Sequence, residues 1–243
     1  MPLKLLTLNI EHDRHLDAVA QTIATHLPDI VCLQEVFEKD CLKLAAVGGY
    51  QVKYAISTLM PEGDVGNTTP RSWGVAVLTR VPVHNQTVSY YADDARIRIF
   101  KESNDPRRMV VMTELQHEGR YYRIGTTHFT WSMGGETTDE QRADFQRLRQ
   151  VLLPYPDYVL CGDFNAPRGR DLFALFTDEL GLVDHLPPQV TTTIDPKLHY
   201  AGALELAVDT IFSTPEYQVI DVQVLEGISD HKGILGWVER RTP

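Results

Sequence analysis

Short apolar runs that end in polar residues recur along the chain, and this pattern constrains the fold more than any other feature. Residues 3–10 and 29–36 are two such runs, each typical of a buried strand. Between them, apolar residues recur at helical spacing, with Asp13 placed to cap the helix and Pro28 placed to end it. A strand, a helix and a strand in this order predict a parallel pair joined by a crossover.

The rest of the pattern predicts many strands and few helices. Further strands are expected at residues 50–56, 73–79, 108–116, 120–129, 158–163, 206–212, 217–225 and 234–238. Residues 82–94 are polar and predict a turn followed by a weakly defined edge. No repeat or linker interrupts residues 1–243, so a single α/β domain is expected, with a packed pair of mixed β-sheets flanked by helices.

The helices and loops that complete this prediction are short. Helices are expected at residues 37–47 and 171–176, and a third begins at Thr138, which has the capping-box pattern with Gln141. Stretches rich in Gly, Pro, Asn and Thr predict long loops at residues 60–71 and 187–203.

One stretch stands at the centre of the polar pattern: Cys161-Gly162-Asp163-Phe164-Asn165. It follows an apolar run and precedes turn-forming residues, so a strand delivers a carboxylate and a carboxamide to a turn. Asp163 and Asn165 are two residues apart and share one face if the strand continues. Gly162 removes side-chain bulk beside them.

Four other segments place polar residues at the end or start of an apolar run. They are Leu8-Asn9-Ile10, Leu33-Gln34-Glu35-Val36, Thr127-His128-Phe129 and Ser229-Asp230-His231. Each alone has an ordinary explanation as a turn, a cap, an exposed strand end or a hydrogen-bonded core histidine. Together they predict one site that collects carboxylate, carboxamide and imidazole groups.

These groups support metal-assisted attack of water on a phosphoryl group. Carboxylate and carboxamide oxygens suit a hard divalent cation such as Mg²⁺, which neutralises charge on phosphate oxygens. A histidine held by a carboxylate acts as a base or stabilises the phosphate. The sequence contains neither a Gly-x-Ser-x-Gly nucleophile elbow nor a Walker-type phosphate loop.

Composition limits the class of partner and the compartment. The formal net charge of −10 argues against broad binding to duplex DNA, which depends on Lys and Arg. Cys32, Cys41 and Cys161 fit no zinc or disulfide spacing, which favours a reducing compartment, and no export leader is recognisable, so a cytoplasmic location is expected. No apolar stretch approaches the length of a membrane span, and a monomer is expected.

The order of these motifs resembles the endonuclease/exonuclease/phosphatase superfamily, the group related to DNase I, and most nearly its tyrosyl-DNA phosphodiesterase 2 and neutral sphingomyelinase branches. The matching residues are Leu8-Asn9, Leu33-Gln34-Glu35-Val36, Thr127-His128, Gly162-Asp163-Phe164-Asn165, Val208-Asp209-Thr210-Ile211-Phe212 and Ser229-Asp230-His231. The resemblance implies a four-layered α/β sandwich with the site at one edge of the two sheets. It also implies that Glu35 holds Mg²⁺ or Mn²⁺, with Asn9 and Asp230 nearby.

The resemblance further implies catalytic roles. Asp163 would orient and deprotonate the attacking water, and Asn165 would bind the scissile phosphate. His231 would stabilise the charge of the transition state, with Asp209 orienting its ring. His128 matches the histidine of the sphingomyelinase and tyrosyl-DNA phosphodiesterase branches.

The expected activity is therefore metal-dependent hydrolysis of a phosphoester, such as a nucleic acid end or a small phosphodiester. A phosphatase or a phospholipid hydrolase of the same fold is the alternative, and a catalytically silent binding module is a third interpretation. Residues 66–71 and 191–199 are candidate pocket loops. The candidate pocket side chains are Arg71, Arg107, Arg108, Trp131 and Tyr200.

Overall fold

Strands β1 (Leu3–Asn9) and β2 (Ile30–Phe37) bury nearly all of their side chains, so both faces of each strand need a covering layer. They pair in parallel, and helix α1 (Leu16–His26) makes the connection between them. The predicted strand–helix–strand opening is therefore confirmed. These elements belong to a computed structural model that describes residues 1–61, 70–92 and 96–241.

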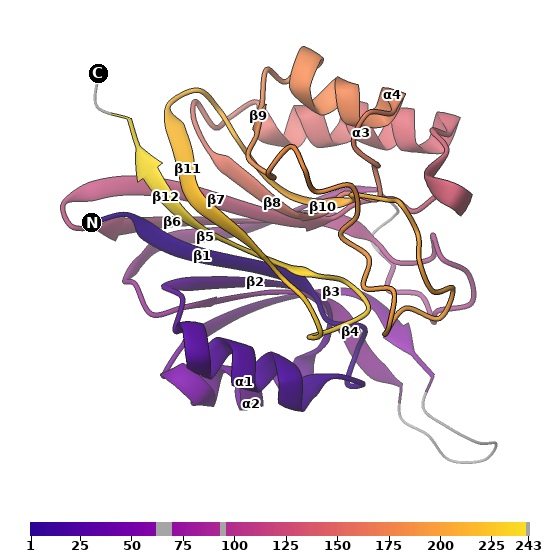
Figure 1. Ribbon diagram of the computed structural model, residues 1–243, viewed down its shortest axis with the longest axis horizontal. Coiled ribbons are helices and arrows are strands. Elements are labelled where there is room, and N and C mark those ends of the chain that lie inside the picture. The colour runs from indigo at the N-terminus through magenta and orange to yellow at the C-terminus, as the bar shows by residue number, and fades with distance from the viewer. Residues whose placement is uncertain (62–69, 93–95, 242–243) are drawn as a thin grey trace.

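Two six-stranded mixed sheets form the centre of the molecule (Figure 1). The first has the strand order β11-β12-β1-β2-β4-β3. Its other strands are β3 (Gln51–Met60), β4 (Arg71–Thr79), β11 (Tyr217–Leu225) and β12 (Gly233–Arg240). β1 lies between the parallel neighbour β2 and the antiparallel neighbour β12, so the sheet is mixed.

The second sheet has the strand order β5-β6-β7-β8-β10-β9. Its strands are β5 (Val83–Ala92), β6 (Arg108–His117), β7 (Arg120–His128), β8 (Val159–Asp163), β9 (Val183–Asp184) and β10 (Asp209–Ser213). The strands predicted at residues 108–116 and 120–129 form the antiparallel hairpin β6–β7, and β8 is parallel to β7 and antiparallel to β10.

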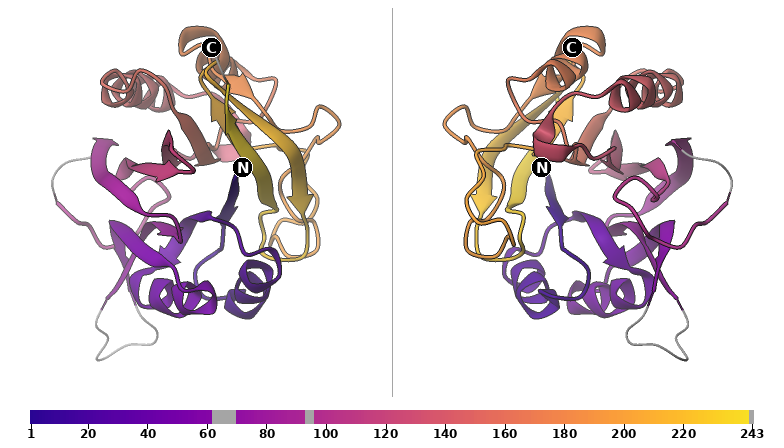
Figure 2. Two further views of the ribbon diagram at one scale, coloured as in Figure 1. Left: turned by 90° about the vertical axis from the view of Figure 1, so that its left-hand side faces the viewer. Right: turned by 90° about the vertical axis from the view of Figure 1, so that its right-hand side faces the viewer.

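Helices cover the outer face of each sheet, which gives four layers of the DNase I-like type. Figure 2 shows α1 and α2 (Glu38–Gly48) on one side of the molecule and α3 (Asp139–Leu152) on the opposite side. The short helix α4 (Asp171–Ala174), a π-helical turn (Leu175–Glu179) and a 3₁₀ turn (Met133–Gly135) complete the helical structure of the described residues. The predicted pair of mixed sheets flanked by helices is confirmed.

Alternation along each strand divides the apolar residues among three cores. In β8, Val159 and Cys161 face the core between the sheets, whereas Leu160 faces the core beneath α3. The third core lies between β1, β2, β4 and helices α1 and α2. Cys32, Cys41 and Cys161 are all buried and free.

Several local predictions were wrong or incomplete. Asp13 does not cap α1, because its carboxylate pairs with Arg71, and His15 stands at the N-cap without a side-chain bond. The polar stretch expected as a weak edge includes the ten-residue edge strand β5. The short strand β9 was not predicted. Most of the expected loop at 60–71 lies outside the described residues, including the first part of the candidate pocket loop 66–71.

Two other local predictions agree with the structure. Thr138 and Gln141 form the capping box at the start of α3. Within the described ranges, no helix is long and apolar enough to cross a membrane.

Candidate active site

The register of the two sheets brings the predicted polar residues to one edge. Asn9 is opposite Gln34 in the first sheet, while Asp163 is opposite both His128 and Asp209 in the second. Asn9, His128 and Asp163 end their strands and Asp209 begins its own, so these side chains meet where the strands stop. The two sheets are linked here, because Asn9 Nδ2 donates to Glu35 Oε1 and to Asp163 Oδ2, both at 3.1 Å.

Glu35 reaches this edge through a β-bulge. The register between β2 and β4 shifts between Leu33 and Val36, and Glu35 has a left-handed φ of 56°. A bulge re-aims one side chain of a strand and is common beside active sites. Gln34, at the same bulge, donates to Thr126 Oγ1 at 3.0 Å in the interior.

Asp163 is held by hydrogen bonds to both carboxylate oxygens. Asn165 N donates to Oδ1 at 2.9 Å, and Asn9 Nδ2 donates to Oδ2. Gly162 before it has a φ of 139°, and a Cβ atom there would lie 2.0 Å from Thr127 O. Only glycine fits at this point, so the sequence Gly162-Asp163 is a condition for placing the carboxylate.

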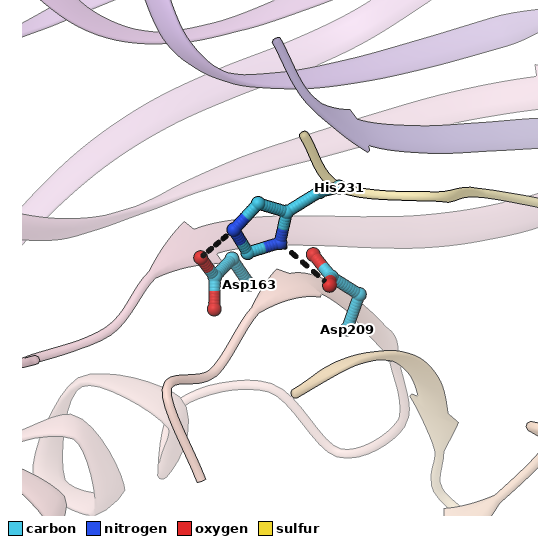
Figure 3. Close-up of side chains that lie close together, drawn as sticks. All are labelled: Asp163, Asp209 and His231. Atoms are coloured by element: carbon cyan, nitrogen blue, oxygen red, sulfur yellow. Dashed lines mark hydrogen bonds and ion pairs between the residues drawn. The ribbon is translucent and has the colours of Figure 1, made fainter. Parts of the chain in front are cut away.

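His231 lies between two carboxylates (Figure 3). Its Nδ1 is 2.8 Å from Asp209 Oδ2, and its Nε2 is 3.9 Å from Asp163 Oδ2. The same oxygen of Asp209 accepts a hydrogen bond from Thr193 Oγ1 at 2.6 Å. His128 approaches Asp163 Oδ2 from another side, with its Nε2 at 3.7 Å.

The two histidines that flank Asp163 differ in charge. Burial lowers the pKa of His231, but attraction to Asp209 and Asp163 outweighs it and holds this pKa well above 6.5. Burial, followed by repulsion from Arg108, lowers the pKa of His128 to about 3. His231 is therefore a cation near neutral pH, and His128 is a neutral imidazole.

The pKa of Glu35 is also shifted, and it is raised. Burial raises the pKa of Glu35 to about 7; the hydrogen bond from Asn9 lowers it, and the charges of Asp230 and Asp163 raise it further. Three acidic groups therefore share one edge and repel one another. An added positive charge would relieve that repulsion.

The donor atoms at this edge fit a divalent cation. The ligand atoms of Asp163, Asp209 and His231 all lie within 4.8 Å of one another. Asp209 Oδ1 has no hydrogen-bond partner among the described residues. A second donor set is Glu35 with the charge of Asp230 beside it, and its oxygen chemistry suits a hard cation such as Mg²⁺ or Mn²⁺.

The structure brings all eight predicted site residues to this edge, although their roles stay predictions. Asn9 donates its amide to two carboxylates, and its Oδ1 accepts from Glu11 N at 3.2 Å. Asn165 donates Nδ2 to Phe129 O at 3.0 Å. Asp230 is buried and accepts from Ser229 Oγ at 3.0 Å.

The predicted pocket side chains lie in different settings. Arg108 is buried behind His128 and donates to its carbonyl at 3.4 Å, while Arg107 lies over the ring of Tyr90. Arg71 lies over the ring of Phe37. Trp131 and Tyr200 are exposed.

Two residues of this edge were not singled out from the sequence. His12 has its Nε2 4.0 Å from Glu35 Oε2, and Thr193 holds Asp209. His12 lies three residues after Asn9, and this closeness was the available signal. Thr193 lies inside the candidate pocket loop 191–199, but nothing in the sequence distinguishes it from its threonine neighbours.

Comparison with known proteins gives one family. The sequence profile described as the Endonuclease/Exonuclease/phosphatase family matches residues 6–231 of the chain. None of the curated proteins compared with the chain matches it significantly.

Solved structures resemble the fold over nearly the whole chain. Three of them are an endonuclease/exonuclease/phosphatase from Bacteroides vulgatus, the human Nocturnin catalytic domain and a humanized D. rerio TDP2. Their identities to the chain are 18%, 19% and 17%, with TM-scores of 0.75, 0.70 and 0.68. The alignments cover 99%, 99% and 98% of this chain and 100%, 95% and 98% of those chains. At such low identity the likeness concerns the fold alone.

Proposed function

The chain belongs to the endonuclease/exonuclease/phosphatase family, and from this premise we propose that it is a metal-dependent phosphohydrolase of the phosphodiesterase type. The observation that carries the proposal is the contact of Asp163 with two differently charged imidazoles and, through Asn9, with Glu35. A proton acceptor (Asp163), a cationic hydrogen-bond donor (His231) and an acidic site for a cation (Glu35) then lie close together. Metal-assisted hydrolysis of a phosphoester can use all three elements.

Asp163 is the group that orients and deprotonates the attacking water. Its two oxygens are fixed by Asn165 N and Asn9 Nδ2, so its position is set before substrate arrives. A carboxylate held in this way needs no rearrangement to accept a hydrogen bond from water.

His231 is the group that donates to the phosphate. Its raised pKa keeps it protonated near neutral pH, so it stabilises negative charge and is a poor base. Its Nδ1 is committed to Asp209, which leaves Nε2 for the substrate. His128 and Asn165 supply neutral donors beside it, and His128 remains uncharged because of burial and Arg108.

Glu35, assisted by Asp230, is the part of the site that holds the cation. The alternative donor set of Asp163, Asp209 and His231 contains the short bond between His231 and Asp209, which a shared metal ion would have to break. Mg²⁺ or Mn²⁺ bound at Glu35 supplies neutralisation of the phosphate and leaving-group charge.

The proposed substrate is a nucleic acid end or a small phosphodiester. The formal net charge of −10 opposes extended contact with a duplex. A mannosyl-6-phosphatase also has this fold, so a phosphomonoester is one alternative substrate class. A phospholipid headgroup is the other alternative. We also propose that the protein is a monomer in a reducing, cytoplasmic environment. The three free cysteines support the reducing environment.

The test is hydrolysis of bis-p-nitrophenyl phosphate with Mg²⁺ or Mn²⁺, followed by a panel of abasic DNA, single-stranded DNA, 5′-phosphotyrosyl DNA, sphingomyelin, inositol phosphates and nucleotides. We expect turnover that EDTA abolishes and that Asp163→Asn reduces at least about 10³-fold. Asp157→Asn is the matched control, because Asp157 is also a buried, hydrogen-bonded aspartate. It lies just before the first residue of β8, whereas Asp163 is the last residue of that strand. Equal activity in wild type and Asp163→Asn would contradict the proposal.

A further inference from the structure

The backbone around His12 is shaped to meet Glu35. His12 N donates to Glu35 O at 3.0 Å, and Ile10 N donates to Gln34 O at 3.1 Å. Glu11, His12 and Glu35 have left-handed φ values of 48°, 67° and 56°. Non-glycine residues seldom adopt this conformation, and those that do cluster at functional sites. Three of them therefore lie together at the carboxylate that the proposed function assigns to the cation.

The imidazole of His12 is also oriented by packing. It stacks on Trp73, with 5.5 Å between ring centroids and an interplanar angle of 22°, and it lies 5.5 Å from the ring of Phe37. Trp73 and Phe37 are buried, so this support is rigid. Trp73 also meets His128 edge-on at 6.0 Å. Trp73 therefore contacts two imidazoles, and His128 Nε2 lies 3.8 Å from Glu35 Oε1.

The spacing between His12 and Glu35 fits two ligands of one ion. His12 Nε2 lies 4.0 Å from Glu35 Oε2, too far for a hydrogen bond. Imidazole nitrogen and carboxylate oxygen each lie about 2.0–2.2 Å from a bound divalent transition metal, so ligands on nearly opposite sides are about 4 Å apart. The other oxygen, Oε1, already accepts from Asn9, which leaves Oε2 facing His12.

We propose that His12 is a nitrogen ligand of the cation held by Glu35, and that the site consequently takes Mn²⁺ in preference to Mg²⁺. The inference rests on the proposed metal site and adds to it a ligand and a metal preference. Mg²⁺ demands oxygen ligands, whereas imidazole favours transition metals. A mixed carboxylate and imidazole set therefore selects against Mg²⁺ while still accepting Mn²⁺.

The experiment measures metal binding directly, in the absence of substrate. Affinities for Mn²⁺ and Mg²⁺ are determined by titration calorimetry on the metal-free full chain, for the wild type and four variants. His12→Asn tolerates the left-handed backbone, and His12→Phe keeps a ring against Trp73 while removing the nitrogens. His15→Asn is the matched control, because His15 pairs with Glu11 at 3.1 Å and has no place in the proposed site. Glu35→Gln tests the metal site itself.

We expect both His12 variants to weaken Mn²⁺ binding by about tenfold or more, and to change Mg²⁺ binding by less than about threefold. The control variant should leave both affinities unchanged. Pulsed electron paramagnetic resonance of the Mn²⁺ complex should show nitrogen hyperfine coupling in the wild type and in His15→Asn, and none in the His12 variants.

The outcomes separate the two proposals. Absence of nitrogen coupling in the wild type, or its persistence in the His12 variants, overturns the role of His12 even if Glu35→Gln abolishes binding. Unchanged metal affinity in Glu35→Gln instead overturns the metal site of the proposed function. If a substitution at His12 disturbs folding, the wild-type spectrum still tests the proposal, because absence of nitrogen coupling overturns it without any variant.

Discussion

The Nδ1 atom of His231 lies 2.8 Å from the Oδ2 atom of Asp209, at the point where β10 begins and the two sheets meet. The side chain of His231 is only 11% exposed. Burial alone lowers the pKa of this imidazole, and the carboxylate of Asp209 is the largest of the influences that raise it. The charge state of His231 is therefore set by its partner.

Asp209→Asn should change the charge of His231 with little change in shape. Without the carboxylate, burial dominates, and the pKa of His231 should fall from well above 6.5 toward or below that value. Near neutral pH the ring then loses its proton, and kcat should drop by about 10²- to 10³-fold. Titration of the ring by nuclear magnetic resonance, together with kcat, checks both parts. A large loss of activity with an unchanged His231 titration would speak against the assigned link.

Thr193 should matter because its hydroxyl serves three groups at once. It donates to Asp209 Oδ2 at 2.6 Å and accepts from the backbone N–H groups of Val208 and Asp209, both at 3.0 Å. Thr193→Val removes these bonds from a fully buried position, so we expect a loss of at least about 2 kcal/mol of unfolding free energy.

Thr193→Ser is the matched variant, because it keeps the hydroxyl and removes one methyl group. It should cost about 1 kcal/mol and should retain the kcat of the wild type. Denaturant unfolding and steady-state kinetics of both variants measure the difference. Equal stability and activity of the valine and serine variants would mean that the Thr193 hydroxyl does not position Asp209.

Local patterns were enough to predict the residues that end strands. Asn9 and Asp163 each end an apolar run, and both end their strands in the structure. Asp209 lay inside the predicted strand 206–212 and was identified only through the family resemblance, whereas β10 begins at this residue. The pair of mixed sheets was predicted from many strands with few helices between them. The convergence of the strand ends then results from the parallel pairing of β1 with β2 and of β7 with β8.

Contacts across the fold account for what the sequence did not predict. His12 is aimed by a left-handed backbone and by stacking on Trp73, 61 positions later, and Thr193 is defined by its bond to Asp209, 16 positions later. Asp13 has the residue type of a helix cap, but it lies two residues before the N-cap residue His15, and its carboxylate pairs with Arg71. β5 is polar because it lies at an edge, and its pairing with β6 comes from backbone groups that carry no sequence signal.

Gly162→Ala should destabilise the fold more than an alanine at another left-handed glycine. A Cβ at Gly162 would lie 2.0 Å from Thr127 O, in the adjacent strand β7. Gly119, at the β6–β7 turn, has a φ of 75°, and a Cβ there would meet nothing within 4 Å, so Gly119→Ala carries only the backbone cost. That cost is about 1–2 kcal/mol, and we expect Gly162→Ala to exceed it clearly in thermal or denaturant unfolding. Similar losses of unfolding free energy in the two variants would show that β7 shifts to accommodate the added methyl group.

Glu35→Gln should stabilise the metal-free protein at neutral pH. The carboxyl of Glu35 has its pKa raised from 4.5 to about 7 in the folded state, so the folded protein holds this proton more tightly than the unfolded chain does. The contribution to stability is complete below pH 4.5 and is lost as the pH rises through about 7. Glutamine does not titrate and keeps the hydrogen bond from Asn9, so the variant should escape this loss.

The same substitution should remove the response to metal. In EDTA, the melting temperature of the wild type should fall relative to that of Glu35→Gln between pH 5 and pH 7, and the difference should level off above about pH 7. Added Mn²⁺ should raise the melting temperature of the wild type alone, because an ion that binds only the folded state stabilises it. This metal-induced shift should weaken below about pH 7, where a proton competes with the ion for Glu35. An equal shift in both proteins would place the cation away from Glu35.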